Sequence, residues 1–284
     1  MLNKDLERIA PNLALSPDGI WRAGHNTPIS YPEEGNLNCL ALEQDSFWFE
    51  HRNRCIQAVI ERFPPGGAVF DIGGGNGYVA LGLIRAGIST VLVEPGEGGA
   101  RNAHRRGVAP VVCATLQDAG FLPASLPSAG LFDVLEHIQF DEAFLCDLAE
   151  RLAPGGRVYL TVPAYRWLWS VDDDYAGHYR RYSLPQLRRV LQAAGLQPEF
   201  ETCIFALLPA PIFLMRALPS RLGLRNQNAW DRYSQEHSSR PGLAGRLLKL
   251  ILHIEGLWLA RGRALPVGGS CLVVARKLPP GFIE

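Results

Sequence analysis

Short apolar runs alternate with amphipathic segments through the middle of this chain. The apolar runs predict buried strands at residues 68–72, 90–94, 110–114, 129–133, 157–162 and 198–206. Apolar residues at helical spacing predict helices at residues 45–63, 77–86, 98–106, 141–152 and 184–194. Strands that alternate with helices in this way are typical of an α/β protein, in which helices cover both faces of a parallel sheet.

Both ends of the chain depart from this alternation. Residues 1–45 are rich in turn-forming residues and predict an irregular N-terminal arm that folds over the domain. A last strand is predicted at 270–277, after an insertion at 207–269. The expected organisation is therefore an arm, a core made of 46–206 and 270–284, and a helical insertion before the last strand.

The insertion contains two apolar segments, 207–218 and 243–261, separated by a polar stretch at 225–240 that predicts an exposed linker. Most positions of the second segment are Leu, Ile or Trp, and its wide apolar face predicts burial. The first choice of partner is the core, on which the segment would form a lid over the substrate pocket. A membrane surface, contacted peripherally, and a second copy of the chain in a homodimer are the alternatives, in that order.

A glycine loop follows the first strand of the predicted core. Asp71 is followed by Gly73, Gly75 and Gly77. Glycines let the backbone pass close to a ligand and adopt φ angles that other residues resist. The next strand ends in Glu94, and an acidic residue at that position is the usual partner of two ribose hydroxyls. Together the loop and the acid predict a site for a nucleoside cofactor.

The spacing within the loop separates the candidate cofactors. A phosphate-binding loop ends in Gly-Lys-Ser/Thr, which does not follow these glycines. A dinucleotide loop needs Gly-x-Gly-x-x-Gly, and the register that starts at Gly75 has Ala80 in the third place, which keeps a nicotinamide cofactor as an alternative. Asp71 would work against a pyrophosphate at this helix N-terminus. A carboxylate suits a cationic ligand, which favours S-adenosylmethionine with its sulfonium and ammonium groups.

Four segments in this order resemble the motifs of the class I S-adenosylmethionine-dependent methyltransferases. They are residues 69–78, residues 91–95, the LFDVLEHI segment at 131–138, and the turn and strand at 152–160. The resemblance covers the predicted core and the last strand. It implies a Rossmann-like, mostly parallel seven-stranded sheet with an antiparallel final pair of strands. It also implies S-adenosylmethionine as the cofactor and S-adenosylhomocysteine as its product.

The matching motifs imply which residues of this chain bind the cofactor. Asp133 ends the fourth strand and is expected to face the methionine portion. Many family members carry Gly-Asp-Ala after the third strand, and here Thr115 stands in place of that Asp. Leu116 is therefore expected to pack on the adenine, with Gln117 or Asp118 supplying a polar contact. The predicted set in the motifs is Asp71, Gly73, Gly75, Asn76, Gly77, Glu94, Pro95, Thr115, Leu116, Gln117 and Asp133.

The helix before the first motif resembles an FWFxxRN helix that is found in a subset of the same family. It carries Phe47, Trp48, Phe49 and Arg52. Arg52 is predicted to meet the carboxylate of the cofactor. The aromatic residues are expected mainly to pack against the core.

Candidate catalytic residues follow the fourth and fifth strands. His137 is the best-placed titratable group for removing a proton from the methyl acceptor, and His178 is the second candidate. The alternative is that His137 only lines or orders the pocket. The loop that carries His178 resembles the LWS…GHxRRY segment of the same subset. Its predicted substrate-binding residues are Trp169, Asp173 and Arg181. An ion-pair network that pins this loop is the alternative interpretation of its charged residues.

Composition narrows the choice of partner and of compartment. Lys plus Arg and Asp plus Glu both number 28, so the formal net charge is zero and no nucleic-acid partner is predicted. Six cysteines are scattered without Cys-x-x-Cys spacing, which predicts reduced thiols in the cytoplasm and no metal site. The N-terminus lacks the apolar core of a signal peptide. The uncharged stretch at 202–215 is shorter than the ~20 residues that span a bilayer.

These observations predict a cytoplasmic S-adenosylmethionine-dependent methyltransferase that acts on a small-molecule acceptor, which is apolar, aromatic or lipid-linked. Oxygen is the first choice of acceptor atom, followed by nitrogen and then carbon. Two alternatives remain open. One is a catalytically inactive scaffold that binds S-adenosylmethionine, and the other is an NAD-dependent oxidoreductase.

Overall fold

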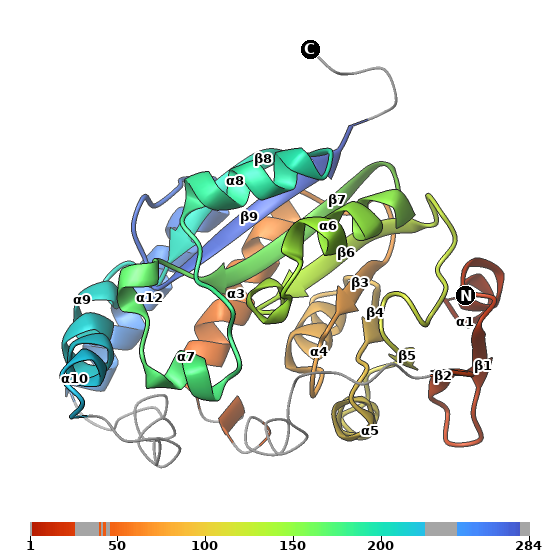
Figure 1. The fold of residues 1–284 in the computed structure, drawn as a ribbon, viewed down its shortest axis with the longest axis horizontal. Helices are drawn as coiled ribbons and strands as arrows, with labels where there is room; N and C mark the ends of the chain where they lie inside the picture. Colours follow the sequence, from red (N-terminus) through yellow and green to blue (C-terminus); the bar gives the residue numbers. More distant parts are fainter. Residues whose placement is uncertain (1, 26–39, 41, 44–45, 225–242, 279–284) are drawn as a thin grey trace.

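A computed structural model describes residues 2–25, 40, 42–43, 46–224 and 243–278 of the chain (Figure 1). Its centre is a nine-stranded sheet in the order β1-β2-β5-β4-β3-β6-β7-β9-β8. The linker predicted at 225–240 lies outside the described residues, as does residue 45, where the first long helix is predicted to begin.

Seven of these strands form the core and confirm the predicted α/β fold. Their bounds are β3 (Val69–Ile72), β4 (Thr90–Val93), β5 (Val111–Cys113), β6 (Leu126–Phe132), β7 (Leu152–Pro163), β8 (Leu196–Ile204) and β9 (Ser270–Lys277). Neighbours among β5, β4, β3, β6 and β7 pair in parallel. Strand β9 lies between β7 and β8 and is antiparallel to both. Every residue of β3, β4 and β5 is buried, as expected of strands that are covered on both faces.

The N-terminal segment extends the sheet, so the prediction of an irregular arm was wrong for its described part. Its elements are α1 (Leu2–Ile9), β1 (Leu13–Leu15) and β2 (Trp21–Ala23). The turn-forming residues 16–19 join β1 to β2, and β2 pairs in parallel with β5, where Trp21 lies opposite Val112. Strands of three residues are too short to show a pattern of their own. They form because the edge of β5 offers a partner and because the Trp21 side chain is buried.

Helices cover both faces of the sheet, as predicted (Figure 1). The longer ones are α3 (Phe47–Arg62), α4 (Tyr78–Arg85), α5 (Glu97–Arg105), α6 (Asp141–Arg151), α8 (Leu184–Ala193) and α12 (Leu243–Ala260). Buried leucines of α6 and α8, such as Leu145 and Leu187, belong to the core on one face. Ile56 of α3, Leu83 of α4 and Leu252 of α12 belong to the core on the other face. Short turns η1 (Leu135–His137), η2 (Arg166–Leu168) and α7 (Val171–Tyr175) follow the carboxyl ends of β6 and β7.

The insertion contributes α12 and three short helical segments, α9 (Pro209–Ile212), η3 (Phe213–Ala217) and α10 (Leu218–Arg221). Helix α12 packs against α3 and buries Leu252 and Leu259 there. Its opposite side also carries apolar residues, and Leu250 and Ile254 are 55% and 53% exposed. Among the described helices, none combines the length and the apolarity that crossing a membrane requires.

Candidate functional site

The glycine loop between β3 and α4 has a backbone that glycine adopts most readily. The φ angles of Gly73, Gly75 and Gly77 are +72°, +53° and +75°, in the left-handed region. A Cβ atom on Gly77 would lie 2.7 Å from the Cβ of Ala103 in α5, which is closer than two non-bonded carbon atoms approach. The loop therefore needs glycine both for its conformation and for its close packing on α5.

Glu94 lies at the carboxyl end of β4 and holds this loop. Its carboxylate accepts hydrogen bonds from the backbone N–H groups of Gly75 at 2.8 Å and Gly96 at 2.7 Å. Burial raises the pKa of Glu94 to about 7, although both hydrogen bonds act to lower it. A carboxylate has roughly four acceptor positions, so this group retains capacity for hydroxyl donors. A hydrogen bond thus connects Glu94, the predicted partner of the ribose, to the predicted glycine loop.

Asp71 is a fully buried carboxyl group in β3. Neither of its oxygens has a well-formed hydrogen bond with any described residue. Burial raises the pKa of Asp71 to about 7, and the positive charge of Arg52 partly opposes that rise. The carboxylate lies directly against the loop, because a Cβ on Gly74 would be 2.7 Å from its Oδ2. Unsatisfied buried groups are rare in folded proteins. This one fits a site for a cationic ligand such as S-adenosylmethionine.

Arg52 on α3 and Asp133 at the end of β6 form an ion pair. Asp133 also accepts a hydrogen bond from the Oγ1 of Thr161 at 2.8 Å. Its φ of +58° places a non-glycine residue in the left-handed region, and such strain is concentrated at functional sites. Two residues that were predicted independently to contact the cofactor therefore lie together. Thr161 was not predicted, although a hydroxyl among the apolar residues of β7 was a usable signal.

Asn76 and Pro95 have polar contacts around the loop. The amide of Asn76 accepts a hydrogen bond from Asn102 at 3.0 Å and donates one to Glu43 at 3.3 Å. The carbonyl of Pro95 lies 3.8 Å from the sulfur of Cys113. These contacts hold the two residues in place, and their contact with the cofactor stays a prediction.

The residues after β5 that were predicted to contact the adenine have their contacts with other parts of the fold. The Oγ1 of Thr115 accepts a hydrogen bond from the backbone N–H of Asp118 at 3.0 Å, which closes a turn. Leu116 is buried in the core. The amide of Gln117 donates to Asp147 on α6 at 2.8 Å. Contacts of these residues with the adenine accordingly stay predictions.

The two candidate bases, His137 and His178, lie side by side although they come from separate segments. Their ring centroids are 4.7 Å apart, with the ring planes at 75°. Burial, together with the neighbouring His178, lowers the pKa of His137 to about 4, and the charge of Asp133 acts in the opposite direction. The imidazole of His137 is therefore neutral at physiological pH. The charge of Asp133 acts on His137, so the pair lies within electrostatic range of the Arg52–Asp133 ion pair.

A buried carboxylate, Asp173, orients His178. Its Oδ1 lies 2.9 Å from the Nδ1 of His178 and accepts a hydrogen bond from the Nε of Arg181 at 2.7 Å. Its Oδ2 accepts a bond from the backbone N–H of Ser170 at 2.9 Å. The ion-pair network considered for this loop is therefore present. Trp169 takes no part in these bonds, since its indole N–H donates to a different carboxylate at 3.1 Å.

Glu136 lies immediately before His137 and is 1% exposed. Its Oε2 has no hydrogen-bond partner among the described residues. Burial and the negative charge of Asp133 raise the pKa of Glu136 well above its usual range. A second unsatisfied carboxyl group thus lies beside the two histidines.

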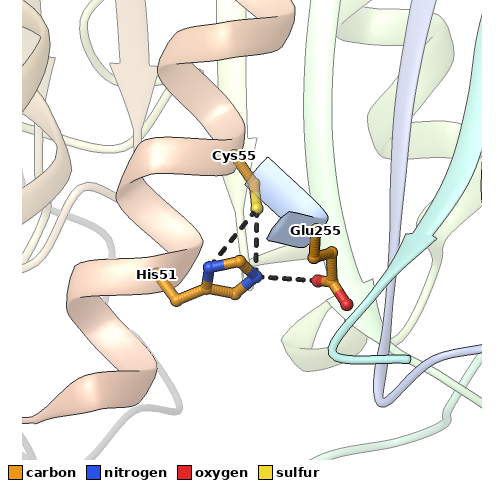
Figure 2. Close-up of side chains that lie close together, drawn as sticks. All are labelled: His51, Cys55 and Glu255. Carbon is orange, nitrogen blue, oxygen red and sulfur yellow. Dashed lines mark hydrogen bonds and ion pairs between the residues drawn. The ribbon is translucent and has the colours of Figure 1, made fainter. Parts of the chain in front are cut away.

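Another polar cluster lies between α3 and α12 (Figure 2). The Nε2 of His51 is 2.7 Å from the Oε1 of Glu255 and 3.3 Å from the sulfur of Cys55. Glu255 also accepts hydrogen bonds from the backbone N–H groups of Phe205 at 2.6 Å and Ala206 at 2.8 Å. All three side chains are buried. In contrast to the Oε2 of Glu136, both oxygens of Glu255 have partners within the protein, and Glu255 connects α12 to α3 and to the end of β8.

Comparison with known proteins gives a family match and a set of similar folds. A family model described as a methyltransferase domain matches residues 47–199. No curated protein matches the chain. The methyltransferase solved in complex with the Trm112 activator from Haloferax volcanii is 15% identical over 88% of this chain and 97% of its own, with a TM-score of 0.57.

Two further structures have the same fold. Phosphoethanolamine N-methyltransferase 2 of Haemonchus contortus, solved with S-adenosylhomocysteine, is 18% identical over 88% of this chain and 59% of its own, with a TM-score of 0.54. An S-adenosylmethionine-dependent methyltransferase of Thermotoga maritima is 16% identical over 87% of this chain and 100% of its own, with a TM-score of 0.53. Identities this low establish similarity of fold alone.

Proposed function

This chain belongs to the methyltransferase-domain family and is an S-adenosylmethionine-dependent enzyme, and from that premise we propose that it methylates a hydroxyl group on a small, largely apolar or aromatic acceptor. The observation that supports an oxygen acceptor is the contact of His137 with His178, next to the Arg52–Asp133 centre. A hydroxyl group must lose its proton during transfer, and imidazole is the side chain best suited to take it.

The proposed cofactor site uses both carboxyl groups at the glycine loop. When bound, S-adenosylmethionine supplies a methyl group that the acceptor oxygen takes by displacing sulfur, so that the C–S electron pair stays on sulfur. Glu94 would accept hydrogen bonds from the ribose, and Asp71 would balance positive charge. Arg52 and Asp133 would hold the methionine portion, since a guanidinium matches a carboxylate and a carboxylate matches an ammonium group.

The proposed acceptor pocket is bounded by the loop that carries His178. Trp167, Tyr175 and Tyr179 in this loop are 44%, 53% and 47% exposed. Exposed aromatic rings supply apolar surface with a polar edge, which suits an aromatic or apolar acceptor. The buried Asp173 bonds to Ser170, His178 and Arg181 within this loop, so substrate positioning would require little further ordering.

A test of this proposal uses purified protein, S-adenosylmethionine with a labelled methyl group, and matched phenol, alcohol and amine acceptors. The expected result is label in a phenol or an alcohol, and none in the amine of the same ring system. Labelling of the amine alone would overturn the choice of oxygen. Tight binding of S-adenosylhomocysteine without transfer to any acceptor in the panel or in cell extracts would favour the inactive scaffold.

Removing either imidazole is expected to slow transfer. His137→Asn and His178→Asn keep polar side chains of similar shape but remove the proton acceptor. We expect kcat to fall by about 10²–10⁴-fold in the variant that loses the general base, with little change in KM. Calorimetry with S-adenosylhomocysteine serves as the control for folding. Unchanged kcat in both variants would show that neither imidazole takes part in the reaction.

Binding of S-adenosylhomocysteine is expected to release protons near neutral pH. Asp71 and Glu94 each have a pKa of about 7 in the free protein. An ammonium group and ribose hydroxyls favour the charged form of a carboxyl group and lower its pKa. Affinity should therefore rise between about pH 6 and about pH 8, by about tenfold for each group that titrates. Calorimetry in two buffers of different ionisation enthalpy counts the protons. Affinity that does not vary with pH would contradict the assignment of both acids.

A further inference from the structure

Three side chains with metal-binding atoms converge beside the proposed acceptor pocket. Glu136 and His137 belong to η1, and His178 comes from the loop after α7. Each offers one ligand atom, and these atoms lie within 4.8 Å of one another. Glu136 is buried, whereas both histidines are partly exposed. The cluster is therefore closed on the protein side and open toward solvent.

The geometry points to a divalent metal site at Glu136, His137 and His178, which we propose binds an ion such as Zn²⁺ or Mn²⁺; its catalytic role rests on the proposed O-methylation. The Oε2 of Glu136 is buried without a hydrogen-bond partner among the described residues. A buried carboxylate needs a compensating charge or donor. Two imidazoles and one carboxylate form a common ligand set for first-row metals, and it leaves coordination positions open.

The residues around the cluster resemble the outer shell of known metal sites. Histidine ligands usually bond through their second nitrogen to a carboxylate or a backbone carbonyl, which fixes the ring. His178 has this arrangement, because its Nδ1 is 2.9 Å from Asp173, and its Nε2 would serve as the metal ligand. His137 has a hydrogen bond with the backbone of Gly177. Asp173 is itself fixed by Arg181, so the second shell is in place.

The spacing of the ligand atoms needs only a local adjustment. Bonds of about 2.0–2.1 Å from Zn²⁺ to nitrogen and oxygen place tetrahedral ligands about 3.3–3.4 Å apart. The observed limit of 4.8 Å exceeds this by about 1.5 Å, a distance that side-chain rotation supplies. The negative charge of Asp133 acts on both Glu136 and His137, and the positive charges of Arg52 and Arg181 act on Glu136 in the opposite direction.

A metal in this position would explain how a hydroxyl group becomes reactive there. An open coordination position accepts the oxygen of the acceptor and lowers the pKa of its hydroxyl group. The hydroxyl proton then passes to water, the oxygen lone pair forms the new O–CH₃ bond, and the C–S pair remains on sulfur. The histidines would act as ligands in this case, and direct proton removal by an imidazole would be unnecessary.

The cluster of His51, Cys55 and Glu255 supplies a matched control (Figure 2). Its ligand atoms also lie within 4.8 Å, but all three residues are buried. Glu255 already accepts hydrogen bonds from two backbone N–H groups and contacts His51. Both of its oxygens therefore have partners without a cation. Cys55→Ser would weaken a metal site at this second cluster while leaving the first one intact.

The experiment titrates the full chain, stripped with a chelator, with Co²⁺ alone and follows the visible absorption bands of the ion. One equivalent is expected to bind to the wild type and to Cys55→Ser. Glu136→Gln and His178→Asn are expected to bind at least about 100-fold more weakly, with S-adenosylhomocysteine affinity unchanged as the control for folding. Failure of the wild type to bind Co²⁺ would overturn the proposal. So would binding that Cys55→Ser loses and Glu136→Gln retains.

Activity separates this proposal from the function on which it rests. If the stripped enzyme methylates a hydroxyl acceptor at the full rate, the metal role is wrong and O-methylation stands. If the protein binds Co²⁺ with the expected visible absorption bands but methylates only amines, the metal site stands and the proposed hydroxyl acceptor is wrong.

Discussion

Glu94→Ala is expected to weaken the binding of S-adenosylhomocysteine by about 100–1,000-fold. The variant would lose the two charge-assisted hydrogen bonds that are proposed to the ribose, each of which contributes about 1.5–2 kcal/mol. It also frees the backbone N–H groups of Gly75 and Gly96, which the carboxylate holds in the free protein. The loop would then lose the support that fixes it at the end of β3.

Calorimetric titration of wild type, Glu94→Ala and Glu142→Ala tests this expectation. Glu142 is the matched control, because it is an exposed carboxylate on α6 and is not among the residues predicted to bind the cofactor. A fall confined to Glu94→Ala, together with no binding of NADH by the wild type, would support the assignment. Equal affinity of wild type and Glu94→Ala would show that the acid holds the loop without meeting the ribose.

Glu255→Ala is expected to lower the free energy of unfolding by about 3–5 kcal/mol. Truncating one partner of a buried polar pair leaves the other partner unpaired in the interior. This destabilises the fold by more free energy than the intact pair contributes. His51 would lose its contact at 2.7 Å, and the backbone N–H groups of Phe205 and Ala206 would lose their acceptor. The loss would also loosen α12 from α3, because Glu255 joins them.

Urea denaturation measures this effect, with Glu61→Ala as the control on an exposed turn of α3. Exposed substitutions of this kind usually change stability by less than about 0.5 kcal/mol. Glu255→Gln is expected to fall between the two, because it keeps an acceptor oxygen. A Glu255→Ala variant as stable as Glu61→Ala would mean that water replaces the carboxylate, and that the cluster contributes little to the fold.

Local patterns predicted most of the fold. The strands around the glycine loop and the final strand at 270–277 follow from apolar runs, because a strand buried on both faces is apolar throughout. The loop and Glu94 were predicted as a cofactor site for a related reason. Their predicted role depends on residues that are near in sequence and on the order of consecutive elements, which a single chain reveals.

The parts that were missed depend on pairing between distant segments. The N-terminal strands are defined by the edge of β5 and not by their own three residues. The bond between His51 and Glu255 joins residues 204 positions apart, and that between Arg52 and Asp133 joins residues 81 apart. Arg52 and Asp133 were each predicted to contact the cofactor, but only the three-dimensional arrangement shows that they form an ion pair. The same holds for Glu136 and His178, whose proximity no spacing rule indicates.

The position of β9 sets a limit on how this sheet can be assembled or shortened. Strand β8 pairs with β9 alone, and β9 fills the place between β7 and β8. During synthesis β8 therefore has no partner strand until the whole insertion and then β9 have left the ribosome, while β7 presents an open edge. A shortened form that stops before Ser270 would lack β9. It would also lose β8 from the sheet, because β8 pairs only with β9. Expression trials of truncated forms should accordingly keep residues 270–277, even where the insertion is altered.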